Sequence, residues 1–239
     1  LSVALFHLFV DGVGDYVTPV DYLLKIVLKE TTEPYTSEQR QKTIIVGSKV
    51  LTYLASVLNG RTYPSNREMD AKLQLEVRNS LFDFLLEAKV AKSPEKYPRV
   101  RALLHANTKE LLAILTAALK DVPNTKRLKQ WLSVLLEIVV DDSQPAFAVQ
   151  EGDGEFSSVQ IGELFEFINL HFTLGTVDIS DYILQRVVAY FLKSSDESTK
   201  SSREDALLKL MESVPTTRLD MTRLLPIAEQ ADLWRVCEY

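Results

Sequence analysis

Apolar residues recur with the period of an α-helix through most of this chain, and that pattern limits the fold more than any other feature. The first clear case is one helix face, spaced i, i+3, i+4, i+7 and i+8, made of Val20, Leu23, Leu24, Val27 and Leu28. Similar faces occur at 44–58, 77–85, 111–119, 128–139, 161–172 and 179–191. The 8 glycines and 9 prolines stand mostly between these segments. The pattern predicts helices joined by mostly short connections.

Residues that cap helices stand in front of several apolar segments. Helices are expected to start at Thr18, Asp178 and Asp220, and each of these is a single N-capping residue. Pairs with the spacing of a capping box are Thr36 and Gln39, Asn107 and Glu110, Ser157 and Gln160, and Ser202 and Asp205. Because Asn107 starts a new helix, His105 is predicted to lie at a corner between two helices. Pro226 predicts a kink in the helix that follows Asp220.

The number and length of these segments indicate the fold class. We expect about ten helices of about 10 to 20 residues and no strand, an all-α protein built as an α-solenoid of stacked, irregular αα-hairpins. A compact all-α domain is the alternative, since no fixed repeat period is visible. Residues 1–239 are expected to form a single α-solenoid segment cut from a longer chain at both ends, because "LSVALFHLFV" and "ADLWRVCEY" are apolar helical patterns without start or stop signals.

Composition excludes several classes of protein. An apolar fraction of 46% is enough for a continuous core. The 27 Lys and Arg against 33 Asp and Glu give a net charge of -6, which disfavours nucleic-acid binding. Cys237 is the single cysteine, so no internal disulfide forms and a cytosolic location is expected. Polar residues interrupt the longest apolar run, 44–58, which is too short for a membrane span.

Residues that could perform chemistry are few and scattered. His7, His105 and His171 have no second His or Cys at metal-ligand spacing, and no cationic residue beside Cys237 favours its thiolate. Four short stretches imitate nucleotide, metal or calcium motifs but lack required residues, namely "DGVGD", "VGSK", "DDSQP" and "EGDGE". We therefore predict no enzyme activity, no catalytic residue, no metal and no cofactor.

Two polar connections have a functional and a structural interpretation. In the loop "GRTYP", 60–64, Arg61 and Tyr63 are of types enriched at interface hot spots, and we predict them as candidate partner-contact residues. The alternative is a helix-terminating turn whose tyrosine packs on the next hairpin. The run 193–202 is a candidate phosphorylation target or an ordinary connection between helices.

Several stretches resemble one family in the same order along the chain. "YPRVRALLHANTKELLAILTAAL" (97–119) is similar to the helical middle region of the vacuolar protein sorting-associated protein 8 family. "VGSKVLTYLASVLNGRTYP" (46–64), "FSSVQIGELFEFI" (156–168) and "RLLPIAEQADLWRVCEY" (223–239) resemble the same family, and "DYVTPVDYLLKIV" fits upstream. The acidic stretch 150–155 and Pro226 depart from the family pattern, which affects local geometry.

The resemblance implies a subunit of the CORVET complex, which tethers early endosomal membranes in vesicle transport. The expected partners are the other subunits of the class C core and an early-endosomal Rab GTPase, which the full-length protein would contact. The expected location is cytoplasmic and peripheral on early endosomes. The β-propeller and the zinc-binding domain of family members are not expected in this segment. An all-α enzyme or small-molecule-binding domain, and a helical-repeat binder of nucleic acid, are the alternatives.

Overall fold

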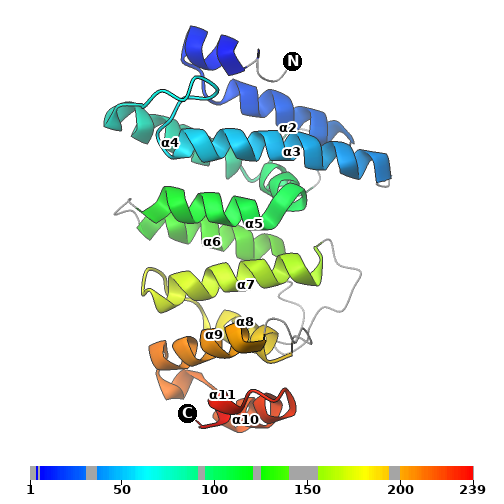
Figure 1. Ribbon diagram of the computed structural model, residues 1–239, viewed down its shortest axis with the longest axis vertical. Helices are drawn as coiled ribbons and strands as arrows, with labels where there is room; N and C mark the ends of the chain where they lie inside the picture. The colour runs from blue at the N-terminus through cyan, green and yellow to red at the C-terminus, as the bar shows by residue number, and fades with distance from the viewer. Residues whose placement is uncertain are drawn as a thin grey trace. The chain divides into compact units, whose positions relative to one another are not determined.

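The computed structural model describes residues 4, 6–30, 37–90, 95–120, 125–139, 156–193 and 200–238. Within these ranges every regular element is a helix, apart from one isolated antiparallel bridge between Arg61 and Glu68 (Figure 1). The chain consists of two compact units, Leu1–Ile138 (unit 1) and Val139–Tyr239 (unit 2).

Unit 1 is built around three helices that contact one another. Its elements are the π-helix η1 (His7–Val13), α2 (Thr18–Glu30), α3 (Ser37–Leu58), α4 (Ala71–Leu85), α5 (Pro98–Lys120) and α6 (Thr125–Val139), whose last residue is assigned to unit 2. Helix α3 contacts α2, α4 and α5, and α2 also contacts α5. The aromatic rings of Phe82 in α4 and Trp131 in α6 meet edge to face, with centroids 5.6 Å apart. Apolar faces of successive helices therefore form one core.

Unit 2 repeats the same kind of packing. Its elements are α7 (Ser158–Thr173), α8 (Asp181–Lys193), α9 (Lys200–Ser213), a 3-10 turn (Thr216–Arg218), α10 (Met221–Gln230) and α11 (Trp234–Glu238). Helix α9 contacts α7, α8 and α11, while α10 contacts α8 and α11. The fully buried side chains include Leu164, Ile168, Leu184, Val187, Leu207 and Leu210. In both units, helices close in sequence pack together, and the all-α, α-solenoid prediction is confirmed.

Three of the expected helix starts are confirmed. Ser157 and Gln160 form a complete capping box at the start of α7, and the Asp220 carboxylate caps α10. Asn107 interrupts α5 with an extended backbone, φ -168° and ψ 97°, and its side-chain oxygen accepts from the Glu110 amide at 3.1 Å. His105 therefore lies two residues before a break between two helical segments, as predicted.

Other starts differ from the prediction. Thr18 is the first helical residue of α2, and the cap is the Asp15 carboxylate, which accepts from the amides of Val17 and Thr18 at 2.9 and 3.0 Å. Ser202 lies inside α9, and the Asp205 carboxylate binds Arg235. The helix expected at Asp178 begins at Asp181. Pro226 lies inside α10, and the expected kink there stays a prediction. The expected cap Thr36, and 194–199 of the polar run 193–202, lie outside the described residues.

The Asp15 cap makes the stability of α2 depend on pH. Burial raises the pKa of Asp15, and hydrogen bonds from Thr18 and Val17 together outweigh that effect, so the pKa lies below its ordinary value of 3.8. The ionised cap therefore stabilises the fold fully above pH 3.8, and this contribution is lost as the pH falls through the lower folded-state pKa.

We predict that Asp15→Ala lowers the free energy of unfolding by about 1 kcal/mol at pH 7. The difference between wild type and variant should disappear in acid, as measured by urea unfolding across the pH range. Ser157→Ala is the control, because it removes an uncharged cap and its cost should not vary with pH. A cost of Asp15→Ala that is unchanged in acid would contradict the assignment.

Candidate partner-contact site

The loop between α3 and α4, residues 59–70 (the α3–α4 loop), is folded into a small hairpin. Gly60 ends α3 with a φ of +80°, a backbone conformation that glycine adopts without strain. The amide of Thr62 donates to the Arg67 carbonyl, and the amide of Met69 donates to the Gly60 carbonyl, both at 2.8 Å. The Tyr63–Pro64 peptide bond at the tip is cis. The loop thus has a defined conformation, which is needed if it is to present side chains to a partner.

Tyr63 packs into an aromatic cluster beneath the loop. Its ring meets those of Phe6 and Tyr53 edge to face, with centroids 5.0 and 5.9 Å away, and Phe6 stacks on Tyr53 at 4.6 Å. Tyr53 is fully buried and donates its hydroxyl to the Tyr16 carbonyl at 2.8 Å. Burial raises the pKa of Tyr53 far above its ordinary value, so the phenol stays neutral. The cluster anchors the loop to α3 and to the residue before η1.

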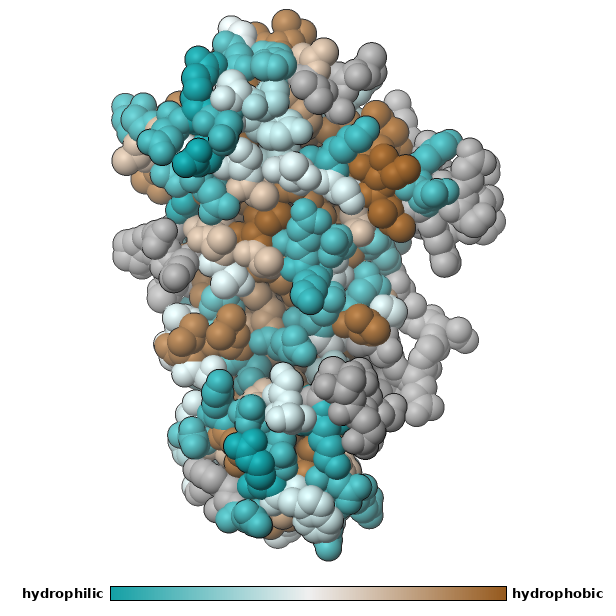
Figure 2. Space-filling model, in the orientation of Figure 1, coloured by the Kyte–Doolittle hydropathy of each residue, from teal (hydrophilic) through white to brown (hydrophobic). Residues whose placement is uncertain are grey.

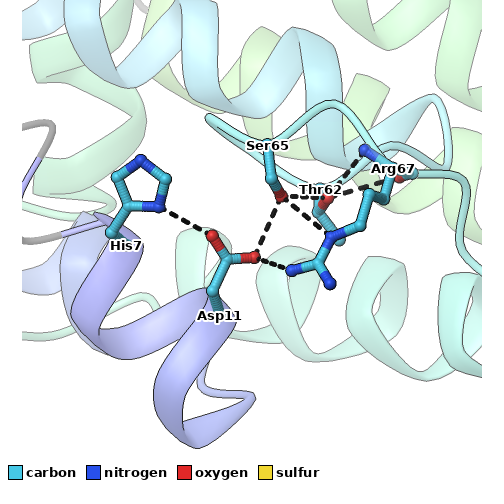
Figure 3. Close-up of polar contacts among 5 residues, drawn as sticks. All are labelled: His7, Asp11, Thr62, Ser65 and Arg67. Atoms are coloured by element: carbon cyan, nitrogen blue, oxygen red, sulfur yellow. Dashed lines mark hydrogen bonds and ion pairs between the residues drawn. The ribbon is translucent and has the colours of Figure 1, made fainter.

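A polar network joins the same loop to η1 (Figure 3), and we call its five members, His7, Asp11, Thr62, Ser65 and Arg67, the Asp11 network. The Asp11 carboxylate accepts from Ser65 Oγ at 2.9 Å and from the Arg67 guanidinium, and it contacts His7 Nδ1 at 2.8 Å. Hydrogen bonds from His7, Arg67 and Ser65, in that order of size, hold the pKa of Asp11 below its ordinary range. The loop therefore has an ionic as well as an aromatic attachment.

Arg61 remains on the surface of this assembly. Its guanidinium has only long contacts within the loop, 3.4 Å to Asn66 Oδ1 and 3.5 Å to Glu68 Oε1, and its side chain is 48% exposed. Exposed pairs of this kind contribute little to stability. The guanidinium can therefore exchange these contacts for those of a partner, whereas the half-buried Tyr63 offers a partner only part of its ring.

The two predicted contact residues, Arg61 and Tyr63, differ in how far they are exposed. Arg61 is exposed, while Tyr63 is half-buried and packs on Phe6 and Tyr53, which precede it in the chain and do not belong to the next hairpin. Sequence reasoning missed the partners that hold the loop, because Asp11 lies 54 residues from Ser65 and 56 from Arg67. No local spacing rule connects residues so far apart.

Of the three histidines and the single cysteine, only His7 is a member of the Asp11 network. His171 is buried in α7, which lowers its pKa, and its Nδ1 lies 3.4 Å from Thr176 Oγ1. Cys237 in α11 is half-buried, and burial raises the pKa of its thiol. Across the part of the chain that the structure describes, no group of three or more His, Cys, Asp or Glu is arranged to hold a metal ion.

Apolar side chains also reach the surface in both units, among hydrophilic ones on the face shown in Figure 2. Those in unit 1 are Leu8, Val13, Tyr22, Ile26, Ile44, Ile45 and Leu75. Those in unit 2 are Val159, Leu170, Leu174, Leu225 and Trp234. Among the described helices, none combines the length and apolar character needed to cross a bilayer. Leu8 and Val13 belong to η1, so the Asp11 network lies beside exposed apolar groups.

Helices that pack on their sequence neighbours, with a firmly attached loop between two of them, define a protein of the helical-repeat class. Residues 1–119 match the family model described as the Vps8 central TPR. The chain belongs to the vacuolar protein sorting-associated protein 8 family and corresponds to part of its central region, as the sequence resemblance predicted.

Individual relatives align along almost the whole chain. The vacuolar protein sorting-associated protein 8 homologs of Mus musculus and Homo sapiens are each 26% identical over 245 residues, which cover 99% of this chain and 16% of the relative. The homolog of Drosophila melanogaster is 25% identical over 249 residues, 99% of this chain and 18% of the relative. The chain thus spans less than a fifth of the length of these relatives. No solved structure matches it.

Proposed function

We propose that this chain is a scaffold and interaction segment of a membrane-tethering subunit that acts in vacuolar protein sorting and endosome fusion. The observation that carries the proposal is the alignment of 99% of the chain with sorting-associated relatives. Stacked helical hairpins present successive helix faces and loops to other proteins, which suits a role in holding them.

The proposal extends to partners and location. The partners are the other subunits of a class C core tethering complex, and the full-length protein engages an early-endosomal Rab GTPase. The segment works in the cytoplasm and reaches early endosomes through these partners, as a peripheral component of the CORVET complex. It requires no cofactor and catalyses no reaction. Residues 1–239 act as one α-solenoid segment of a longer protein.

Within the segment, we propose the α3–α4 loop as a contact for one of these subunits. The support is the combination of an exposed guanidinium at Arg61 with a loop fixed by the aromatic cluster and the Asp11 network. A fixed loop loses little conformational entropy on binding, and arginine and tyrosine are frequent hot-spot residues. Tyr63 contributes the exposed part of its ring and sets the position of the loop.

The test is a binding assay of the chain with each class C core subunit, and with an early-endosomal Rab in its GTP form. We predict that Arg61→Glu weakens binding to one of these partners by about tenfold or more. Tyr63→Phe, which keeps the ring in the aromatic cluster, should have a smaller effect. Lys72→Glu is the control, because Lys72 is a highly exposed cation on α4 of the same unit. Wild-type affinity of Arg61→Glu for every bound subunit would reject the loop as a contact, and binding of no subunit would reject the scaffold role.

A further inference from the structure

Ser65 occupies a decisive position in the attachment of the α3–α4 loop to η1. Its hydroxyl donates to Asp11 Oδ1 at 2.9 Å, lies 2.7 Å from Thr62 Oγ1 and accepts from Arg67 Nε at 3.4 Å (Figure 3). Asp11 Oδ1 also accepts from the Arg67 guanidinium. One hydroxyl therefore touches both members of the ion pair that joins the loop to η1.

A negative charge at this hydroxyl would change the balance of the network. The lowered pKa of Asp11 keeps its carboxylate ionised at neutral pH. A phosphate carries about two negative charges and three acceptor oxygens, so at Ser65 it would repel Asp11 and attract Arg67. The Arg67 side chain is 66% exposed and free to turn toward a phosphate on its own loop. Repulsion of Asp11 and recruitment of Arg67 both act against the contact between loop and η1.

We propose that Ser65 is a phosphorylation site, and that its phosphate releases the α3–α4 loop from η1. In the reaction, an ATP-dependent Ser/Thr kinase transfers the γ-phosphoryl group to Ser65 Oγ. The new bond joins Oγ to the γ-phosphorus, the bond from that phosphorus to the β,γ-bridging oxygen breaks, and ADP leaves. The hydroxyl proton passes to a base of the kinase. The loop stays folded after release, because its hydrogen bonds between Thr62 and Arg67 and between Gly60 and Met69 do not involve η1.

The closed network also limits access to the hydroxyl. Because Ser65 Oγ is hydrogen-bonded to Asp11, a kinase needs the loop to detach transiently, and the phosphate then prevents the contact from reforming. Variants that weaken the contact should therefore be better substrates. We expect Asp11→Asn and Arg67→Gln to be phosphorylated faster than wild type, since each removes the ion pair and leaves Ser65 in place.

The first experiment installs phosphoserine at position 65 of the chain and measures amide hydrogen exchange. We expect the exchange rate of the backbone amides of η1, residues 7–13, to rise about tenfold or more, because η1 loses charge-assisted hydrogen bonds to the loop. Phosphoserine at Ser80, an exposed position of α4, is the matched control and should leave η1 unchanged. Unchanged exchange in 7–13 with phosphoserine 65 would overturn the release.

The second experiment examines the protein isolated from its own cells after phosphatase inhibition, by mass spectrometry of the peptide that contains Ser65. A phosphorylated fraction that increases in Asp11→Asn and Arg67→Gln supports the proposal. An unmodified Ser65 in wild type and in both variants overturns it. Any effect of the phosphate on partner binding rests on the proposed function, in which Arg61 contacts a partner. The hydrogen-exchange result does not depend on that role. Release without a change in partner affinity would reject the contact role and keep the phosphorylation site.

Discussion

Gly47→Ala is expected to lower the free energy of unfolding by about 2 kcal/mol, because α3 and α5 cross at this residue without room for a side chain. A Cβ on Gly47 would lie 2.2 Å from the Ala106 Cβ and 3.6 Å from its Cα. Alanine favours a helix over glycine by about 1 kcal/mol, so intrinsic propensity predicts the opposite sign. The measured sign therefore decides between helix propensity and packing at the crossing.

A second substitution, at Ala106, should restore part of the stability that Gly47→Ala removes. In the double variant Gly47→Ala, Ala106→Gly, the new methyl group meets only the Cα at 3.6 Å, an ordinary van der Waals distance. We expect the double variant to be more stable than Gly47→Ala alone, although glycine at position 106 costs about 1 kcal/mol of helix propensity. Ala117→Gly is the control for that cost, because Ala117 is exposed on the same helix. Additive effects of the two changes would show that the crossing does not constrain residue size.

The two tryptophans allow the unfolding of unit 1 to be followed within the whole chain. Trp131 is fully buried in α6, while Trp234 is 55% exposed in α11 of unit 2. A Trp234→Phe background leaves Trp131 as the single tryptophan reporter. Urea unfolding monitored by its fluorescence should show the midpoint shift of Gly47→Ala, and the slope should stay constant if only stability changes.

The sequence predicted the helices well because their signals are local. The apolar faces follow a period of 3.6 residues, and the Ser157 and Gln160 capping box requires only residues three apart. Asn107 was identified in the same way, and it breaks α5 at the expected place. Where a stronger acceptor stands just outside the expected start, as Asp15 does before Thr18, the local rule selected the wrong residue.

The candidate site could be predicted only in part, because its geometry depends on distant residues. Glycine, proline, arginine and tyrosine in "GRTYP" indicated a turn with interface residue types. The aromatic contacts of Tyr63 involve Phe6 and Tyr53, and the ionic contact involves Asp11. These pairings arise from tertiary packing, which a single sequence does not encode in any short spacing. Gly47 is a similar case, since its place inside the apolar run 44–58 gives no sign that it is a contact between helices.

Arg99 is a buried charged residue that joins three helices of unit 1. Only 8% of its side chain is exposed, and its guanidinium donates to the Phe84 carbonyl at 2.6 Å and to the Glu87 carboxylate at 2.5 Å. It lies 3.7 Å from the centroid of the Phe84 ring and 3.8 Å from Asp21 of α2. The Phe84 carbonyl lies in the last turn of α4, where carbonyls lack partners within the helix. Arg99, a residue of α5, therefore completes the hydrogen bonding at the end of α4 and also contacts α2.

We predict that Arg99→Met lowers the free energy of unfolding by about 3 kcal/mol, because methionine keeps the packing on Phe84 and removes every hydrogen bond. Arg99→Lys should cost less, since an ammonium retains the charge without the forked geometry. Glu87→Gln should cost less than about 1 kcal/mol, because its side chain is 55% exposed. The control Lys72→Met removes a highly exposed cation and should be nearly neutral. A buried charged side chain is sometimes replaced by an apolar one without loss of stability. A neutral Arg99→Met would therefore mean that packing on Phe84 stabilises this contact between helices, and that the Phe84 carbonyl finds another hydrogen-bond donor.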